Sequence, residues 1–225
     1  MSDPRTFAIG DIHGCLRSLR LLEESVPFQP RDRIITLGDY VDRGFQSCQV
    51  LDWLLDRKSR YELITIRGNH EVMMQCAREG AEYLQDWLTV GGDTTLESYR
   101  TSPSEPRLKD IPSRHWKLLD SGLLPYYETA THAFLHACYV HDLPFADQPD
   151  DVLYWSVFNS PPPHISGKTV ICGHTSQRTG LPRNIGHAVC IDTWAYGAGW
   201  LTCLEPSTGR FWQASERGFL RSGEL

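Results

Sequence analysis

Three apolar runs in the first third of the chain each end in a polar cluster that contains glycine. The runs are Thr6–Ile9, Ile34–Leu37 and Tyr61–Ile66, and the clusters are Gly10–Gly14, Gly38–Gly44 and Arg67–Glu71. Apolar residues at helical spacing follow each cluster, which predicts three strand–cluster–helix units. This repetition favours an α/β fold with an open, doubly wound sheet, whose sites gather beyond the carboxyl ends of the strands. Three clusters in register therefore predict one shared site.

The size of the chain limits the number of domains. It has 225 residues, of which 40% are hydrophobic, and this is enough for one sizeable core. We therefore expect a single domain over residues 1–225. Between residues 72 and 120 the apolar residues fit short helices, and no Gly/Ser linker marks a domain boundary. We expect residues 72–120 to be a helical insertion over the site.

Charge and cysteine content exclude some classes of protein. A net charge of −6 argues against a nucleic-acid-binding surface, which usually shows clustered lysine and arginine. Seven scattered cysteines without a C-x-x-C pair favour free thiols in a reducing cytoplasm. No apolar run reaches the roughly 18 residues that a membrane-spanning helix needs. We expect a cytoplasmic protein with neither a nucleic acid nor a membrane as partner.

The second half of the chain is predicted to be mainly strand. Leu123–Glu128 and Thr131–Ala137 alternate well enough for a hairpin. Four further runs are expected to build a second sheet: Thr169–Cys172, Ala188–Asp192, Trp200–Leu204 and Arg210–Gln213. Two of these predicted strands end in histidine, at His136 and at His174.

The polar residues at the predicted strand ends form a set of oxygen and imidazole donors without a thiolate. They are Asp11, His13, Asp39, Asn69, His136 and His174. Such donors suit Mn²⁺, Fe or Zn²⁺. They suffice for two ions if Asp39 is shared, and ions about 3.5–4 Å apart can hold a hydroxide for in-line attack on a phosphate. Each residue alone would more often be structural, so the prediction depends on the whole set.

Four further residues have predicted roles in catalysis or substrate binding. His70, beside Asn69, is the candidate general acid, and Asp42 is the carboxylate available to orient it and raise its pKa. Arg43 and Arg67 can present planar donor pairs to the phosphate oxygens. In isolation either arginine would be an ordinary surface ion-pair residue.

The motifs Gly10–Gly14, Gly38–Gly44 and Gly68–Glu71 resemble, in order and spacing, those of the PPP-type serine/threonine phosphoprotein phosphatases of the calcineurin-like metallophosphoesterase superfamily. The residues from Trp87 to Tyr99 are similar to the bacterial and phage branch, which includes bis(nucleosyl)tetraphosphatases. The resemblance covers about residues 5–205. It implies a β-sandwich of mixed sheets flanked by helices, and two divalent ions, with Mn²⁺ first and Fe or Zn²⁺ as alternatives.

The resemblance also implies how the ligands divide. One ion would be held by Asp11, His13 and Asp39, and the other by Asp39, Asn69, His136 and His174. The chain departs from the family pattern at Val157, where the family commonly has a phosphate-binding arginine, and at Ala137-Cys138, where a glycine often stands. Arg178 or Arg183, in the loop after Gly173-His174-Thr175, could replace the missing arginine.

The function predicted first is hydrolysis of phosphoserine, phosphothreonine or phosphotyrosine in proteins, by a hydroxide that bridges two metal ions, with His70 as acid. The alternative is hydrolysis of a dinucleoside polyphosphate or another small phosphoanhydride. A third class, a phosphoprotein-binding module without turnover, would not need the general acid. A nucleotide hydrolase would need an aromatic face for the base, which Trp194, Tyr196 or Trp200 could supply, although core positions are an equal expectation for them.

Overall fold

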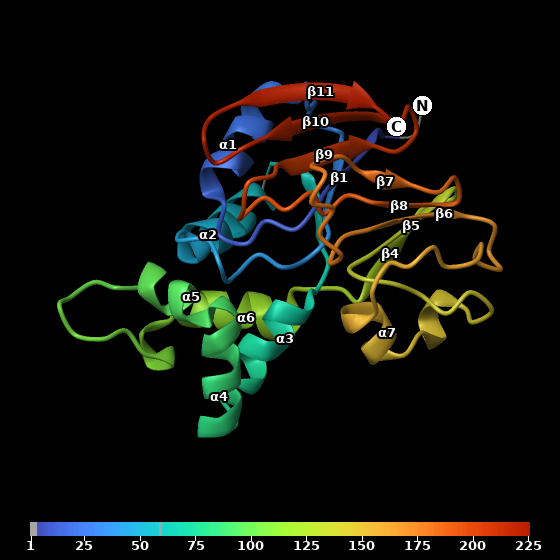
Figure 1. The fold of residues 1–225 in the computed structure, drawn as a ribbon. Helices are drawn as coiled ribbons and strands as arrows, with labels where there is room; N and C mark the ends of the chain where they lie inside the picture. Colours follow the sequence, from blue (N-terminus) through green and yellow to red (C-terminus); the bar gives the residue numbers. More distant parts are fainter. Residues whose placement is uncertain (1–3, 59) are drawn as a thin grey trace.

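The computed structural model describes residues 4–58 and 60–225 and shows two mixed β-sheets flanked by helices (Figure 1). The first sheet has the order β11-β10-β9-β1-β2-β3. Its strands are β1 (Thr6–Ile9), β2 (Arg33–Thr36), β3 (Glu62–Thr65), β9 (Leu201–Glu205), β10 (Arg210–Ala214) and β11 (Leu220–Glu224). The predicted strand–helix units supply β1, β2 and β3, which pair in parallel.

The second sheet has the order β4-β5-β6-β8-β7. Its strands are β4 (Tyr126–Glu128), β5 (His132–Leu135), β6 (Thr169–Cys172), β7 (Arg183–Asn184) and β8 (Ala188–Cys190). The predicted hairpin is confirmed, because β4 and β5 pair antiparallel. The parallel run β5-β6-β8 brings the ends of β5 and β6, and with them His136 and His174, to one edge.

The two sheets pack face to face and form a β-sandwich. One apolar cluster joins side chains of the first sheet, such as Ile35 and Leu204, to side chains of the second, such as Phe134 and Ile171. Helices α1 (Leu16–Ser25) and α2 (Ser47–Arg57) cover the outer face of the first sheet, and α7 (Asp150–Trp155) packs with the second. The sandwich implied by the family resemblance is therefore confirmed.

The prediction of an open, doubly wound sheet is wrong. The free edge of β1 pairs antiparallel with β9, through Ala8 and Leu204, instead of with another parallel strand. β9 and β10 were expected in the second sheet, yet they extend the first. Both strands are largely buried. An apolar run predicts that a strand is buried, but it does not predict which strand lies beside it. The sequence patterns also missed β11 and α7.

Residues 69–121 form a group of helices below the sheets in Figure 1. They are α3 (Asn69–Cys76), α4 (Ala81–Trp87), the kinked segment η1 (Leu88–Gly92), α5 (Asp93–Ser98), the 3₁₀ turn η2 (Leu108–Asp110) and α6 (Ser113–Ser121). A further 3₁₀ turn, η3 (Phe145–Asp147), precedes α7. Trp87 is fully buried where this group meets the sandwich. Two predictions stay predictions: that residues 1–225 form a single domain, and that residues 72–120 are a helical insertion over the site.

Two predictions from composition can be compared with the structure. All seven cysteines are free thiols, as expected. None of the helices that the structure describes is both long enough and apolar enough to cross a membrane.

Candidate metal centre

The turns after the strands have an unusual backbone. Five residues other than glycine in these turns have φ between 43° and 73°: His13, Asp39, Asp42, Arg43 and His174. A side chain in this left-handed region costs free energy, and such residues gather at functional sites. They follow β1, β2 and β6, whose carboxyl ends meet at one edge of the sandwich. The backbone strain therefore coincides with the predicted site.

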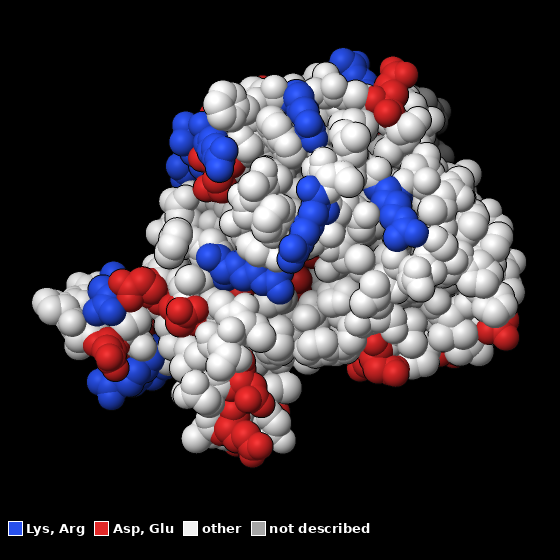
Figure 2. All heavy atoms as spheres, viewed as in Figure 1, with Lys and Arg blue, Asp and Glu red and all other residues white. Residues whose placement is uncertain are grey.

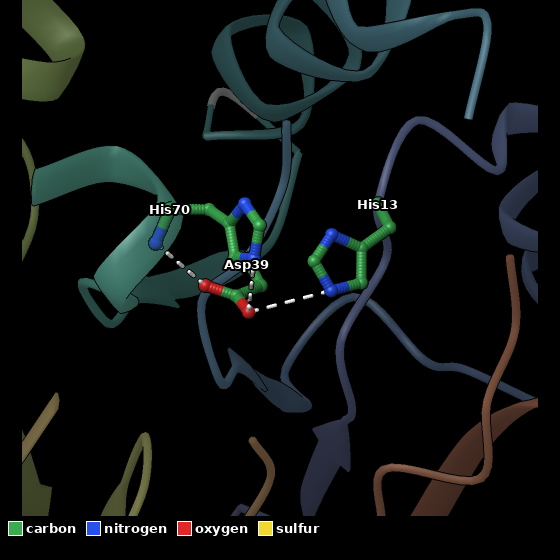
Figure 3. Close-up of side chains that lie close together, drawn as sticks. All are labelled: His13, Asp39 and His70. Carbon is green, nitrogen blue, oxygen red and sulfur yellow. Dashed lines mark hydrogen bonds and ion pairs between the residues drawn. The ribbon is translucent and has the colours of Figure 1, made fainter. Parts of the chain in front are cut away.

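Asp39 lies at the centre of the site (Figure 3). Its Oδ2 is 3.3 Å from His13 Nε2 and 4.0 Å from His70 Nε2, and its Oδ1 is 3.5 Å from His136 Nε2. Burial alone would raise the pKa of the Asp39 carboxyl, but the surrounding histidines outweigh burial and hold the pKa below its usual value. Asp39 is thus a carboxylate that faces several imidazoles.

Two compact groups of donor atoms share Asp39. The first group contains His13 and His70, and the second contains His136 and His174. In each group the donor atoms lie within 4.8 Å of one another, as a metal ion would require. A single carboxylate that belongs to both groups is the arrangement that a bridging ligand needs.

Three histidines of the site have one ring nitrogen turned to a backbone carbonyl. His13 Nδ1 lies 2.9 Å from Val41 O, His136 Nδ1 2.8 Å from Leu37 O, and His174 Nε2 3.2 Å from Trp155 O. Each carbonyl accepts the ring N–H and leaves the other nitrogen with a lone pair that faces the site. Burial lowers the pKa of His13 well below its usual value and that of His174 to about 4, so both rings are neutral. A neutral imidazole whose other ring nitrogen donates to a backbone carbonyl fits a divalent cation.

Asn69 and Asp11 occupy different places beside these histidines. Asn69 Oδ1 lies 3.0 Å from His136 Nε2 and 3.2 Å from His174 Nδ1, so it belongs with the second group. The Asp11 carboxylate accepts the backbone N–H of His174 at 2.9 Å. Burial raises the pKa of Asp11, and the neighbouring Asp192 and Asp39 raise it further. Several buried carboxyl groups in one place again fit a site that takes cations.

His70 differs from the other histidines of the site because its outer nitrogen contacts a carboxylate. His70 Nδ1 lies 2.6 Å from Asp42 Oδ2, and both side chains are buried. Burial would lower the pKa of His70, but the charges of Asp39 and Asp42 outweigh it and raise the pKa. His70 Nε2 faces Asp39 at the edge of the site. This geometry is the one that a proton donor needs.

Two residues from the helical segment hold Asp42 in place, and sequence reasoning had given neither of them a role. The Trp87 indole N–H donates to Asp42 Oδ2 at 2.9 Å, and the Thr95 hydroxyl donates to Oδ1 at 2.7 Å. Glu71 was missed as well. Its buried carboxylate accepts the backbone N–H groups of Gly68, Asp39 and Tyr40. An acid three residues after a helix cap is the signal that could have found Glu71.

Several basic side chains lie in the middle of the face shown in Figure 2, while the acidic ones lie mostly around its periphery. Arg43 Nη1 donates to His13 Nε2 at 3.0 Å, and its guanidinium lies 4.5 Å from the centre of the Tyr196 ring. Arg67 is half-buried, and its Nε has no partner among the residues that the structure describes. Arg43 therefore has a donor at the site, whereas the one hydrogen bond of the Arg67 guanidinium within the described part of the chain is from Nη2 to Leu119 O at 3.5 Å.

The two candidates for the missing arginine lie in different surroundings. Val157 is 63% exposed. Arg183 donates to Phe158 O and to Ser160 Oγ, so it is bound to the loop that follows Val157. Arg178 is exposed and lies 5.2 Å from the centre of the Trp194 ring. Of the three candidate aromatic residues, Trp194 and Tyr196 adjoin the site, whereas Trp200 pairs with Arg221.

Comparisons with known proteins agree with this geometry. The family described as calcineurin-like phosphoesterase matches residues 4–178. A symmetrical bis(5'-nucleosyl)-tetraphosphatase of Pseudomonas putida (strain W619) is 35% identical over 133 residues, which are 59% of this chain and 41% of that protein. One of Methylobacillus flagellatus is 32% identical over 138 residues, 56% of this chain and 47% of that protein. The chain thus spans less than half the length of the curated relatives it matches.

Solved structures show the same fold. A candidate diadenosine tetraphosphatase superimposes with a TM-score of 0.65 at 18% identity, covering 99% of this chain and 94% of that one. A cold-active protein-tyrosine phosphatase of a Shewanella species gives 0.62 at 14% identity, with 99% and 82% covered. A protein serine/threonine phosphatase from Saccharomyces cerevisiae gives 0.59 at 16% identity, with 99% and 80% covered. At these identities the likeness is one of fold alone.

Proposed function

Because the chain belongs to the calcineurin-like phosphoesterase family, we propose that it hydrolyses a phosphoanhydride bond of a dinucleoside polyphosphate with two divalent metal ions. The observation that carries the metal part is the pair of donor groups that share Asp39. Asp39, His136 and His174 would hold one ion together with Asn69, and His13 and Asp39 would hold the other. Asp11, which lies outside both donor groups, would complete this second set in place of His70, whose outer nitrogen contacts Asp42. Mn²⁺ is the first candidate because the family resemblance implies it, and Fe or Zn²⁺ are alternatives that imidazole and oxygen donors suit as well.

The chain's own residues would bind the phosphates and move the proton. Bound divalent ions supply Lewis-acid charge and lower the pKa of water. Arg43 and Arg67 would donate to the non-bridging phosphate oxygens, since Arg43 lies against His13 and Arg67 has a buried Nε without a partner among the described residues. His70 Nε2 would protonate the leaving phosphate oxygen, while Asp42 holds the other ring nitrogen at 2.6 Å. Trp87 and Thr95 would keep Asp42 oriented.

The nucleotide substrate is supported by two independent findings. The curated relatives described above are named as symmetrical bis(5'-nucleosyl)-tetraphosphatases, although this chain spans less than half of their length. An aromatic ring, Tyr196, packs edge-on against His13 at 4.9 Å, so the site has an aromatic side next to its donors. A nucleobase needs such a side, and inorganic or alkyl phosphates do not. We place this reaction in the cytoplasm, in line with the seven free cysteines.

Phosphoprotein hydrolysis, which the sequence had favoured, becomes the second candidate. It would use the same donors and the same His70–Asp42 pair. The exposed side chains of Trp155 and Val157 favour it, because they leave one edge of the site open to a peptide. The fold likeness to two protein phosphatases is compatible with either substrate.

A substrate panel separates the two candidates. The Mn²⁺-loaded protein is assayed with diadenosine tetraphosphate and with phosphoserine, phosphothreonine and phosphotyrosine peptides at equal concentrations. We expect the dinucleotide to have a kcat/KM at least tenfold above that of any peptide. A peptide that exceeds the dinucleotide would reverse the order of the candidates. No metal-dependent turnover of either class by folded protein would contradict both.

A further inference from the structure

Trp194 has a backbone conformation that a bulky residue rarely adopts. Its φ is 65°, in the left-handed region, where a side chain other than glycine is strained. The conformation is held from outside, because the Trp194 N–H donates to Asp192 Oδ1 at 2.9 Å and Ser176 Oγ donates to Asp192 Oδ2 at 2.6 Å. An indole kept at a strained position, where glycine would fit without cost, points to a use for the ring.

Neighbouring residues hold the Trp194 indole in a fixed position. A Cβ at Gly197 would overlap the Trp194 ring, so the ring lies directly on this stretch of backbone. The Tyr196 ring meets it edge-on, with centroids 6.3 Å apart and planes at 89°. Trp194 is only half-buried, and the chain between residues 192 and 197 thus presents a fixed aromatic surface. Trp194 and Tyr196 together are called the aromatic shelf below.

The shelf leads directly to the metal centre. Tyr196 packs edge-on against His13 with centroids 4.9 Å apart, so Trp194 lies two ring contacts from a proposed ligand. An arginine lies over each ring of the shelf: Arg43 over Tyr196 at 4.5 Å and Arg178 over Trp194 at 5.2 Å. Among the described residues, no hydrogen bond or ion pair ties the Arg178 guanidinium. Arg178 can therefore turn from the indole to a phosphate.

We infer that the aromatic shelf binds the nucleobase of a nucleotide whose phosphate lies at the metal centre, with the base stacked on Trp194 and Arg178 turned to the phosphate chain. This inference rests on the proposed function and names the part of the site that recognises the base. Stacking suits any base, because each has a π face, and an arginine beside the ring adds a donor for phosphate. Trp200 is not part of the shelf, since the arginine over its ring, Arg221 at 4.3 Å, is already bound to Gln213 Oε1 and Gly180 O.

The test measures binding of AMP, ribose 5-phosphate and inorganic phosphate to the Mn²⁺-loaded protein by calorimetry, without turnover. Trp194→Gly removes the ring and leaves a backbone that suits φ 65°. The dissociation constant for AMP should rise about 10–100-fold, as expected for the loss of one stacking contact with a base. The dissociation constant for inorganic phosphate should change less than about twofold. Trp194→Phe should keep most of the AMP affinity. The matched control is Trp116→Ala, which removes an indole under Arg78 at 4.3 Å in α6 and should leave AMP binding unchanged.

Three results would overturn the inference. The first is equal weakening of AMP binding and phosphate binding in Trp194→Gly, which would mean a structural role only. The second is equal affinity of the wild-type protein for AMP and ribose 5-phosphate, a comparison that needs no variant. Loss of phosphotyrosine-peptide binding, with AMP unaffected, would assign the shelf to a peptide and also contradict the inference. Failure of the proposed function is seen separately, as wild-type protein that binds AMP yet does not cleave diadenosine tetraphosphate.

Discussion

The histidines on the two sides of the site have different partners at the outer ring nitrogen. On one side, His13, His136 and His174 each contact a backbone carbonyl through the outer ring nitrogen. On the other side, His70 contacts the carboxylate of Asp42. Burial lowers the pKa of His13 and His174, whereas the nearby carboxylates raise that of His70. A carbonyl partner therefore prepares a neutral ligand, and a carboxylate partner prepares a proton donor.

The largest effect is expected at the residue that both sides share. Asp39→Asn removes the carboxylate that belongs to both donor groups. Turnover of diadenosine tetraphosphate should fall to below about one-thousandth, because charge stabilisation by both ions is weakened at once. Metal content by atomic absorption should fall below two ions per chain. Two tightly bound ions with wild-type turnover would contradict the bridging role.

His70→Asn tests whether His70 is a proton donor instead of a ligand. Turnover should fall by about 10²–10⁴-fold, the usual contribution of a general acid, while metal content stays near that of the wild type. The matched variant His13→Asn should lose metal as well as activity, since His13 is assigned to the ligand side. If His70→Asn also loses metal, the division between the two sides is wrong.

Asp42→Asn tests what raises the pKa of His70. The raised pKa means that the ring keeps its proton to higher pH than a free histidine, and the activity of the acid form is lost as pH rises through that value. Without the carboxylate, the alkaline limb of the kcat profile should move to lower pH, and kcat at neutral pH should fall by about 10–100-fold. An unmoved alkaline limb would show that Asp42 only packs against the ring.

The smallest effect is expected at the helical segment. Trp87→Phe removes one donor to Asp42 and keeps an aromatic ring in the core. A lost hydrogen bond to a charged group costs about 1.5–3 kcal/mol, and because Thr95 still holds Asp42 we expect a fall in kcat of only about 3–10-fold. KM should stay unchanged, and the melting temperature reports any loss of packing. A larger change in KM than in kcat would place Trp87 in substrate binding instead.

The sequence predicts the metal side far better than the rest of the molecule. Asp39 and His174 follow predicted strands and His136 lies at the end of one, and parallel strand ends meet at one edge, so their approach follows from local pattern. The position of β9 does not follow from local pattern, since the pairing of Ala8 with Leu204 joins distant parts of the chain. Trp87 reaches Asp42 across 45 residues. Trp194 was only one of three candidate rings until its backbone and neighbours were known.

The central claim is that Asp39 bridges two ions while His70 contacts neither. Anomalous diffraction from crystals grown with Mn²⁺ tests this directly, because it locates each ion among the side chains. The account predicts two peaks about 3.5–4 Å apart, both next to the Asp39 carboxylate. It also predicts His13 beside one peak, His136 and His174 beside the other, and His70 bound only to Asp42. A single peak, or a peak within ligand distance of His70 Nε2, would contradict it.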